Sequence, residues 1–158
     1  MLLLVLRHAK AEKDSPTGRD EDRPLSDLGR RQAEFIGSHL LRPGKGLKTP
    51  ALILSSPAAR ARTTAEIIAK ALGLKVGFDD SLGLGADTRE ALQLVRQLAQ
   101  AEHTALIVGH NPQFEDLAAE LGQRDDRLRT GELIGFDITL DGTRVLATEV
   151  ATVRLEED

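Results

Sequence analysis

Two histidines in this sequence each follow a short apolar run. The run at 1–6 (MLLLVL) ends at Arg7 and His8, and the run at 105–108 (ALIV) is followed by a glycine and His110. Apolar runs of this length are typical of strands buried on both faces of a parallel sheet. Because ligands of open α/β sheets bind at the carboxyl ends of the strands, we expect His8 and His110 to meet at one ligand-binding edge.

Two arginines add positive charge at this edge. Arg7 directly precedes His8, and Arg60 falls in the first turn of a helix that we expect Ser56 and Pro57 to begin. A cation in a first helical turn opposes the helix dipole at a cost of about a few tenths of a kcal/mol, unless an anion binds there. Guanidinium groups and helix N-termini both bind phosphoryl oxygens. These residues therefore predict an oxyanion site that suits a phosphoryl group.

Strands alternate with helices along the chain, which predicts an α/β fold. We expect a single domain over residues 1–158, built as a three-layer α/β/α sandwich with a mostly parallel sheet and a C-terminal antiparallel hairpin at its edge. The expected strands lie at 1–8, 51–54, 75–78 and 104–108, the expected helices begin at the N-caps Ser26, Ser56, Asp87 and Asn111, and the hairpin starts at Glu132 and turns at Asp141-Gly142.

The composition disfavours several classes of function. With a net charge of −4, interspersed charges and no Tyr or Trp, the chain does not have the basic face and aromatic platforms typical of nucleic-acid binders. It has no cysteine, which excludes thiol nucleophiles, disulfides and zinc–cysteine sites and fits a reducing cytoplasm. The first apolar run is too short for a signal sequence or a membrane span. We therefore expect a cytoplasmic protein without membrane attachment.

Other charged residues have simpler interpretations. We expect three of them to be solvated surface residues: His39, Arg62 and His103. The polar segment 9–24 is expected to form one long loop, and loops of this length tend to be functional or disordered. Its acidic run 20–22 is expected to be solvated, whereas Arg23 beside it could reach the edge that carries His8. The role of this loop is left open.

Four motifs, taken in order, resemble the histidine phosphatase (phosphoglycerate mutase-like) superfamily, and within it they are most similar to the SixA-type phosphohistidine phosphatases. The motifs are Leu6-Arg7-His8-Ala9, the stretches 24–33 (PLSDLGRRQA) and 56–65 (SPAARARTTA), and Gly109-His110-Asn111-Pro112. They span the chain from the first strand to the helix after His110. One departure is Ala9, because the family's usual Arg-His-Gly reads Arg-His-Ala here.

The resemblance implies a metal-independent phosphatase that uses no cofactor. It implies that His8 is the nucleophile and becomes phosphorylated during turnover. It also implies that the phosphate pocket is formed by Arg7, Arg60 and His110, with Asn111 contributing to substrate binding. The chemistry agrees, because a neutral imidazole can attack phosphorus and fixed cations stabilise the charge on its oxygens. His110 adds to that charge if it is protonated.

A general acid is harder to identify than the nucleophile. The carboxylate that larger relatives use for this role has its nearest counterpart in Asp87. The spacing from Asp87 to Glu90 also fits a capping box at a helix start, which explains Asp87 at least as well. We keep Asp87 as a possible general acid.

The first hypothesis for the reaction is hydrolysis of phosphohistidine on a protein, which would place the enzyme in signal transduction. A small-molecule phosphomonoesterase of the same superfamily is the second hypothesis, and a non-catalytic phosphate-binding module is the third. The presence of both histidines and both arginines disfavours the module. A mutase is least favoured, because the segments between elements are too short for a lid that keeps a sugar phosphate from water. The sequence identifies neither the physiological substrate nor the oligomeric state.

Overall fold

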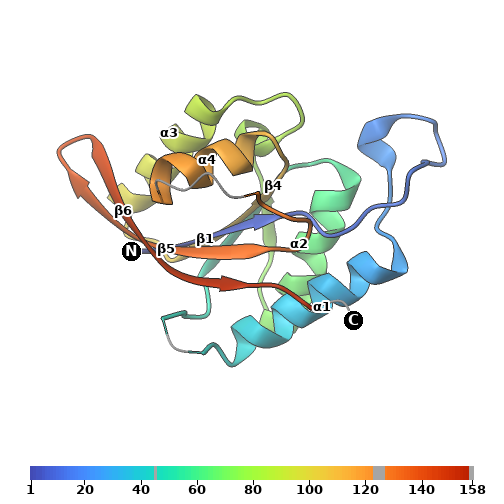
Figure 1. Ribbon diagram of the computed structural model, residues 1–158, viewed down its shortest axis with the longest axis horizontal. Coiled ribbons are helices and arrows are strands. Elements are labelled where there is room, and N and C mark those ends of the chain that lie inside the picture. Colours follow the sequence, from blue (N-terminus) through green and yellow to red (C-terminus); the bar gives the residue numbers. More distant parts are fainter. Residues whose placement is uncertain (45, 123–126, 157–158) are drawn as a thin grey trace.

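The computed structural model describes residues 1–44, 46–122 and 127–156. Its strands form one six-stranded sheet with the order β3-β2-β4-β1-β5-β6 (Figure 1). The strands are β1 (Leu2–Arg7), β2 (Leu52–Ser55), β3 (Val76–Phe78), β4 (Ala105–Gly109), β5 (Leu133–Asp141) and β6 (Arg144–Val153). The helices are α1 (Asp27–Leu41), α2 (Ala59–Leu72), α3 (Thr88–Gln100) and α4 (Gln113–Gly122), with 3-10 turns η1 (Asp20–Asp22) and η2 (Asp80–Leu82). None of the helices in these ranges is long and apolar enough to span a membrane.

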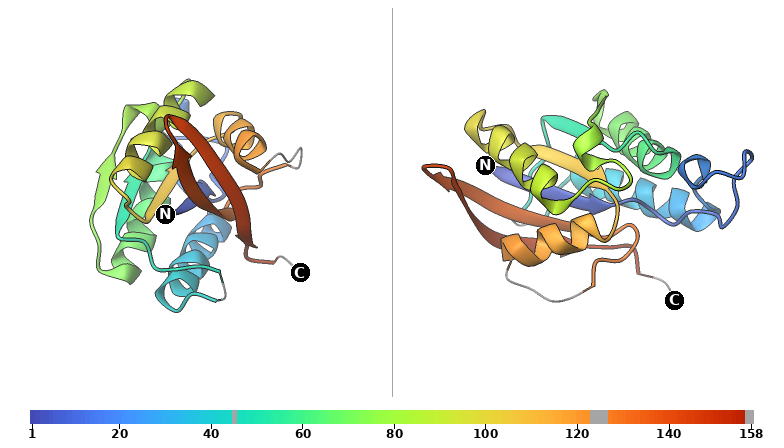
Figure 2. Two further views of the ribbon diagram at one scale, coloured as in Figure 1. Left: turned by 90° about the vertical axis from the view of Figure 1, so that its left-hand side faces the viewer. Right: turned by 90° about the horizontal axis from the view of Figure 1, so that it is seen from above.

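Helices cover both faces of this sheet, which confirms the predicted three-layer α/β/α sandwich. α1 and α2 pack on one face, and α3 and α4 pack on the other (Figures 1 and 2). β1 contributes to both cores, because successive side chains of a strand point to opposite faces. Leu3 and Val5 lie in the core with α3 and α4, whereas Leu4 and Leu6 lie in the core with α1 and α2. All four are fully buried, as expected for a strand covered on both sides.

The strand directions bring the motif residues to one edge of the sheet. β1 to β4 run parallel, whereas β5 pairs antiparallel with β1 and with β6, which forms the predicted edge hairpin. Arg7 at the end of β1 pairs in register with Gly109 at the end of β4. His8 and His110, which follow these two residues, therefore lie at the same edge of the sheet. Ser56 lies at this edge too, because it follows β2, which pairs with β4.

Two of the four predicted helix starts are confirmed. Ser26 is the N-cap of α1, and its Oγ accepts a hydrogen bond from the backbone N–H of Gly29 at 3.0 Å. Asp87 is the N-cap of α3 and forms the predicted capping box with Glu90. Both side chains satisfy N–H groups that a first helical turn leaves without an intrahelical partner.

The other two helix starts were predicted wrongly. α2 begins at Ala59, because the Oγ of Ser56 accepts a hydrogen bond from the backbone two residues on and turns the chain before the helix. α4 begins at Gln113, and Asn111 does not cap it, because its Oδ1, the atom that would accept from a helix N–H, has no hydrogen-bond partner among the described residues, while its Nδ2 donates to a backbone carbonyl of a neighbouring loop. Arg60 still falls in the first turn of α2, as predicted.

The segment 9–24 forms a loop with a closed base. An antiparallel bridge between Ala11 and Leu25 joins its two ends, and the turn η1 lies within it. Figure 1 shows the loop extending past the carboxyl end of β1, and η1 contacts α2. The loop therefore lies beside the edge at which His8 and His110 meet.

Candidate active site

His8 lies at the end of β1 with its ring fixed by two contacts. Nδ1 lies 2.8 Å from the carbonyl oxygen of Ala9, which can only accept a hydrogen bond, so we assign the ring proton to Nδ1. Nε2 then keeps a lone pair and accepts a hydrogen bond from Nε of Arg60 at 3.3 Å. The residue is 7% exposed. His8 therefore presents the basic nitrogen Nε2 to the site, as a nucleophile requires.

Burial keeps this imidazole neutral. Loss of solvent lowers the pKa of His8 from 6.5 to about 3. The hydrogen bond to Ala9 opposes the shift, while His110 and the two nearby arginines favour it. At neutral pH the lone pair of Nε2 is therefore available without a preceding deprotonation.

His110 lies beside His8, as the sequence predicted, with the ring centroids 5.1 Å apart. Its Nε2 is 2.7 Å from Oγ of Ser56, and its Nδ1 is buried without a hydrogen-bond partner among the described residues. Burial, and then the charge of Arg60, lowers the pKa of His110 to about 4. His110 is therefore neutral at neutral pH and adds no positive charge in the free protein.

Arg60 is buried in the first turn of α2, with its side chain only 7% exposed. Besides contacting His8 through Nε, it donates from Nη1 to the carbonyl oxygen of Asp20 at 2.8 Å and from Nη2 to the Asp20 carboxylate at 3.0 Å. An anion beside a helix N-terminus offsets the unfavourable placement of a cation there. In the free protein that anion is Asp20.

Asp20 is a site residue that the sequence analysis missed. The acidic run predicts a solvated side chain, and this one is 58% exposed, yet its carboxylate also lies 3.0 Å from Nη1 of Arg23. The hydrogen bond from Arg23 and then the one from Arg60 lower the pKa of Asp20. Arg23 therefore contacts the site through this carboxylate. Nothing in the run 20–22 distinguishes Asp20 from its neighbours, so the sequence carries no signal for this contact.

Arg7 supplies the second guanidinium next to His8. Its Nη1 donates to the carbonyl oxygen of Leu128 at 3.1 Å, and its Nε is buried without a partner in the described part of the chain. Burial lowers the pKa of Arg7, and Glu115 opposes this shift. Arginine nevertheless stays protonated in proteins. Arg7 and Arg60 thus bring two positive charges to His8.

Side chains from two helices hold the backbone that follows β1. Thr64 of α2 accepts a hydrogen bond from the N–H of Ala9 at 3.1 Å and donates to the carbonyl oxygen of Arg60 at 2.7 Å. Gln32 of α1 accepts a hydrogen bond from the N–H of Lys10 at 2.9 Å. Both residues lie inside motifs noted above, but the sequence analysis gave them no role. The i, i+4 spacing of Arg60 and Thr64 is a signal that both face the site.

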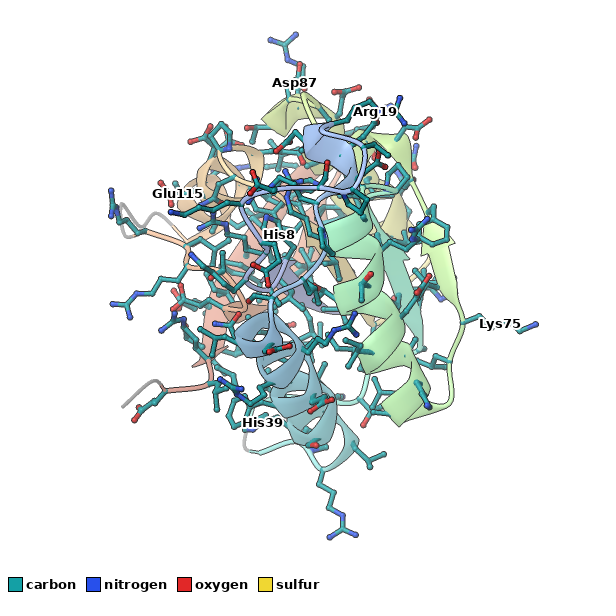
Figure 3. The ribbon with its side chains drawn as sticks, turned by 90° about the vertical axis from the view of Figure 1, so that its right-hand side faces the viewer. His8, Arg19, His39, Lys75, Asp87 and Glu115 are labelled. Atoms are coloured by element: carbon teal, nitrogen blue, oxygen red, sulfur yellow. The ribbon has the colours of Figure 1, made fainter. Side chains whose placement is uncertain are left out.

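Among the described contacts, two predicted residues form hydrogen bonds with other groups and none with the nucleophile. Asn111 stabilises the backbone at Leu128, next to Arg7, because its Nδ2 donates to the carbonyl oxygen of Leu128 at 2.9 Å. Asp87 lies at the margin of Figure 3, away from His8, and its carboxylate accepts a hydrogen bond from the N–H of Glu90 at 2.9 Å. The structure therefore groups four of the predicted residues: Arg7, His8, Arg60 and His110.

The three residues expected at the surface do not belong to this group. His103 is exposed, Arg62 is half exposed with its Nε 3.9 Å from Glu66, and His39 lies far from His8 in Figure 3. Within the ranges that the structure describes, no group of three or more His, Cys, Asp or Glu residues is arranged to hold a metal ion.

Known families and proteins resemble this chain. The family model described as "Histidine phosphatase superfamily (branch 1)" matches residues 3–83, a range that includes His8 and Arg60. An uncharacterised chloroplastic protein of Arabidopsis thaliana is 33% identical over 138 residues, which is 81% of this chain and 62% of that protein, so the chain spans less than two thirds of its length. An uncharacterised protein of Picosynechococcus is 31% identical over 161 residues, covering 99% of this chain and 89% of that protein.

Solved structures share the whole fold. The protein histidine phosphatase SixA complexed with tungstate matches with a TM-score of 0.81 at 23% identity, covering 98% of this chain and 97% of that chain. A putative phosphohistidine phosphatase SixA from Agrobacterium tumefaciens matches with a TM-score of 0.78 at 29% identity, covering 96% of each chain. A mycobacterial glucosyl-3-phosphoglycerate phosphatase matches with a TM-score of 0.73 at 19% identity, covering 95% of this chain and 97% of that chain.

His8 and His110 are expected to stay unprotonated from about pH 8 down to about pH 5, well below the ordinary range of histidine, because burial lowers their pKa values to about 3 and about 4. NMR spectra of the ring nitrogens should show no titration of either ring in this range. As the pH falls from 6.5 toward 3, the unfolded chain binds the His8 proton before the folded chain does, so the free energy of unfolding should decrease. A His8 midpoint near 6.5 would contradict this environment.

Replacing Asp20 with Asn removes a negative charge from Arg60 while keeping a hydrogen-bond acceptor of the same size. Inorganic phosphate should then bind roughly two- to fivefold more tightly, a small effect because an exposed carboxylate is well screened. Titration calorimetry measures the change. Glu21→Gln is the matched control, since Glu21 is in the same turn but pairs with Arg19. Weaker phosphate binding by Asp20→Asn would mean that the carboxylate supports Arg60 instead of competing for it.

Proposed function

This chain belongs to the histidine phosphatase superfamily, and we propose that it hydrolyses phosphohistidine on proteins through a phosphoryl group carried on His8. The observation that carries the proposal is the unprotonated Nε2 of His8, held beside the guanidinium groups of Arg7 and Arg60 at the carboxyl edge of the sheet. A neutral imidazole is the nucleophilic form, and two fixed cations match the charge that develops on phosphoryl oxygens.

In the first step, Nε2 of His8 attacks phosphorus in line with the bond to the substrate nitrogen. The new bond from Nε2 to phosphorus forms as the old one breaks, and the substrate imidazole leaves as a neutral ring after taking a proton from solvent. Arg7 and Arg60 stabilise the equatorial oxygens during the transfer. The Ala9 carbonyl accepts a hydrogen bond from Nδ1–H of His8 and so stabilises the positive charge that the ring acquires.

In the second step, water attacks phosphorus and the bond to Nε2 breaks. Inorganic phosphate is released, the water proton passes to solvent, and His8 returns to its neutral form. Its low pKa favours this return, because the buried ring is more stable without charge. The arginines remain the charge-stabilising groups in both steps.

The chemistry of the leaving group makes phosphohistidine a more suitable substrate for this site than an alkyl phosphate. Imidazole has an unperturbed pKa near ~6.5 and departs as a neutral ring, whereas a departing alkoxide needs a general acid that contributes about 10²–10⁴ in rate. Asp87, the nearest candidate for that acid, is engaged in the capping box of α3. The similarity to the SixA structures supports the same substrate class.

A small-molecule phosphomonoesterase is the second candidate. The mycobacterial glucosyl-3-phosphoglycerate phosphatase has the same fold, and its name describes a small phosphorylated substrate, so this fold is compatible with such a reaction. The third hypothesis, a non-catalytic phosphate-binding module, is disfavoured because His8 has the protonation state of a nucleophile.

The proposed phosphohistidine phosphatase also includes a cytoplasmic location and a place in signal transduction. It includes a single domain over residues 1–158, which is supported by the one sheet that contains every described strand.

A phosphoryl group should be trapped on His8 during turnover. Rapid quenching in alkali with a ³²P-labelled phosphoramidate should give an acid-labile, alkali-stable label on the wild-type protein, because phosphorus is bound to nitrogen. His8→Ala should carry no label and show no turnover, with an unchanged circular dichroism spectrum. His103→Ala, which changes an exposed histidine, is the control. Equal labelling of the His8→Ala protein would remove His8 from the mechanism.

Arg60→Ala should lower kcat by roughly 10²-fold or more, the effect typical of removing one donor to a transition-state oxyanion. Arg62→Ala removes the same kind of side chain two residues further along α2, where it is exposed and contacts only Glu66 among the described ion pairs. This control should keep kcat within about twofold of wild type, as surface substitutions usually do. Near-normal kcat and KM for Arg60→Ala would be inconsistent with the proposed site.

Comparing turnover of a phosphoramidate with turnover of an alkyl phosphate tests the substrate class directly. The wild type should prefer the phosphoramidate, and Asp87→Asn should change that activity by less than about twofold, because imidazole-like leaving groups need no general acid. Thermal denaturation of the variant measures the contribution of the helix cap. If Asp87→Asn folds normally but loses activity on every substrate, Asp87 is the general acid and the small-molecule candidate moves ahead.

A further inference from the structure

A cavity of about 500 Å³ opens beside Arg7. Figure 3 places Glu115, at its wall, to one side of His8, and Arg19 of the loop 9–24 lies toward the other side. Most of the charged side chains that line this cavity are cationic: Arg7, Lys10, Arg127, Arg129 and Arg154. Because Arg7 belongs both to this cavity and to the phosphate site, a molecule in one lies next to the other.

The loop that carries Arg127 and Arg129 is fixed to the active site. Between these two arginines, Leu128 is only 2% exposed, and its carbonyl oxygen accepts a hydrogen bond from Nη1 of Arg7 at 3.1 Å. Its N–H donates to the carboxylate of Glu115 at 2.9 Å. The two arginines therefore flank an anchored residue and are held at the rim of the cavity.

Among the described residues, three of these cations form no ion pair. Lys10, Arg127 and Arg129 are exposed, and none of them forms an ion pair with another described residue. Glu115 is the carboxylate that lines the cavity, and it is engaged with the Leu128 N–H and with Asn111. The chain as a whole has a net charge of −4, so a cluster of cations at this place does not follow from the composition.

We propose that this cationic rim binds acidic side chains that flank the phosphohistidine of a protein substrate. The inference rests on the proposed function, since it describes how that substrate is recognised. Arginine binds carboxylates through paired N–H donors. Exposed cations at a rim can reach groups on the surface of a macromolecule, and they accelerate its association when its charge is opposite. An inorganic phosphoramidate occupies only the phosphate site and does not reach the rim.

The test uses two phosphohistidine peptides that differ only in having Glu or Gln on both sides of the phosphorylated residue, with inorganic phosphoramidate as the third substrate. The double variant Arg127→Gln/Arg129→Gln should raise KM for the Glu peptide by roughly tenfold, with kcat unchanged, because rim charges act on encounter and not on the chemical step. KM for the Gln peptide and turnover of phosphoramidate should change by less than about twofold. The wild-type preference for the Glu peptide should fall as salt is added.

The matched control is Arg30→Gln/Arg31→Gln, which removes two exposed arginines from α1. It should leave all three substrates unaffected. The proposal is overturned if the Arg127/Arg129 variant behaves like this control, if it affects the two peptides equally, or if it affects inorganic phosphoramidate as much as the Glu peptide. Failure of the proposed function gives a different result: the wild type hydrolyses none of the phosphoramidates but hydrolyses alkyl phosphates. In that case phosphoserine peptides with the same Glu and Gln flanks test the rim, under the same criteria.

Discussion

The site depends on one uncharged imidazole held among arginines. His8 remains neutral because its ring is buried, and the Ala9 carbonyl fixes its proton on Nδ1, so that Nε2 faces Arg60. Solvation of this ring would restore a pKa near ~6.5 and leave part of it protonated at neutral pH. The two arginines of the proposed phosphate site also disfavour protonation of the ring beside them. In the proposed reaction, the same two arginines therefore support both phosphoryl binding and the nucleophilicity of His8, and the fold must keep those side chains and the ring in fixed positions.

That fixed position depends on the backbone after β1. The carbonyl of Lys10 lies so close to Gly29 of α1 that a Cβ at this position would collide with it, so the glycine of the second motif allows the chain to pass the helix. From the other side, Gly131, with φ of +71°, donates its N–H to the carbonyl oxygen of His8 at 3.0 Å. The departure at Ala9 is also explained, because its methyl group is fully buried against Leu25 and neighbouring apolar side chains.

The sequence predicted the parts of this structure that arise from local patterns. Apolar runs located the strands, and parallel strands must end at one edge, so the meeting of His8 and His110 followed from periodicity. The prediction that Arg60 lies beside an anion followed from its unfavourable place in a first helical turn. Asp20 was not predictable, because its contact with Arg60 depends on how a long loop folds back over α2. The predicted start of α2 was also wrong because of contacts that a local pattern does not show. Serine is a favoured N-cap residue, but the hydroxyl of Ser56 accepts a hydrogen bond within a tight turn and contacts His110.

The charge of Asp20 bears on which bond this site can break. Arg23 and Arg60 lower its pKa, so near neutral pH it is a carboxylate that can accept a proton from water but cannot donate one to a departing oxygen. The carboxylate of Asp87, the other candidate acid, accepts a hydrogen bond from the backbone at the N-terminus of α3. Neither carboxylate is therefore suited to protonate an alkoxide, whereas a phosphorus–nitrogen bond needs no such donor from the protein. The same arrangement that keeps Arg60 paired in the free protein therefore supports the proposed preference for a nitrogen leaving group.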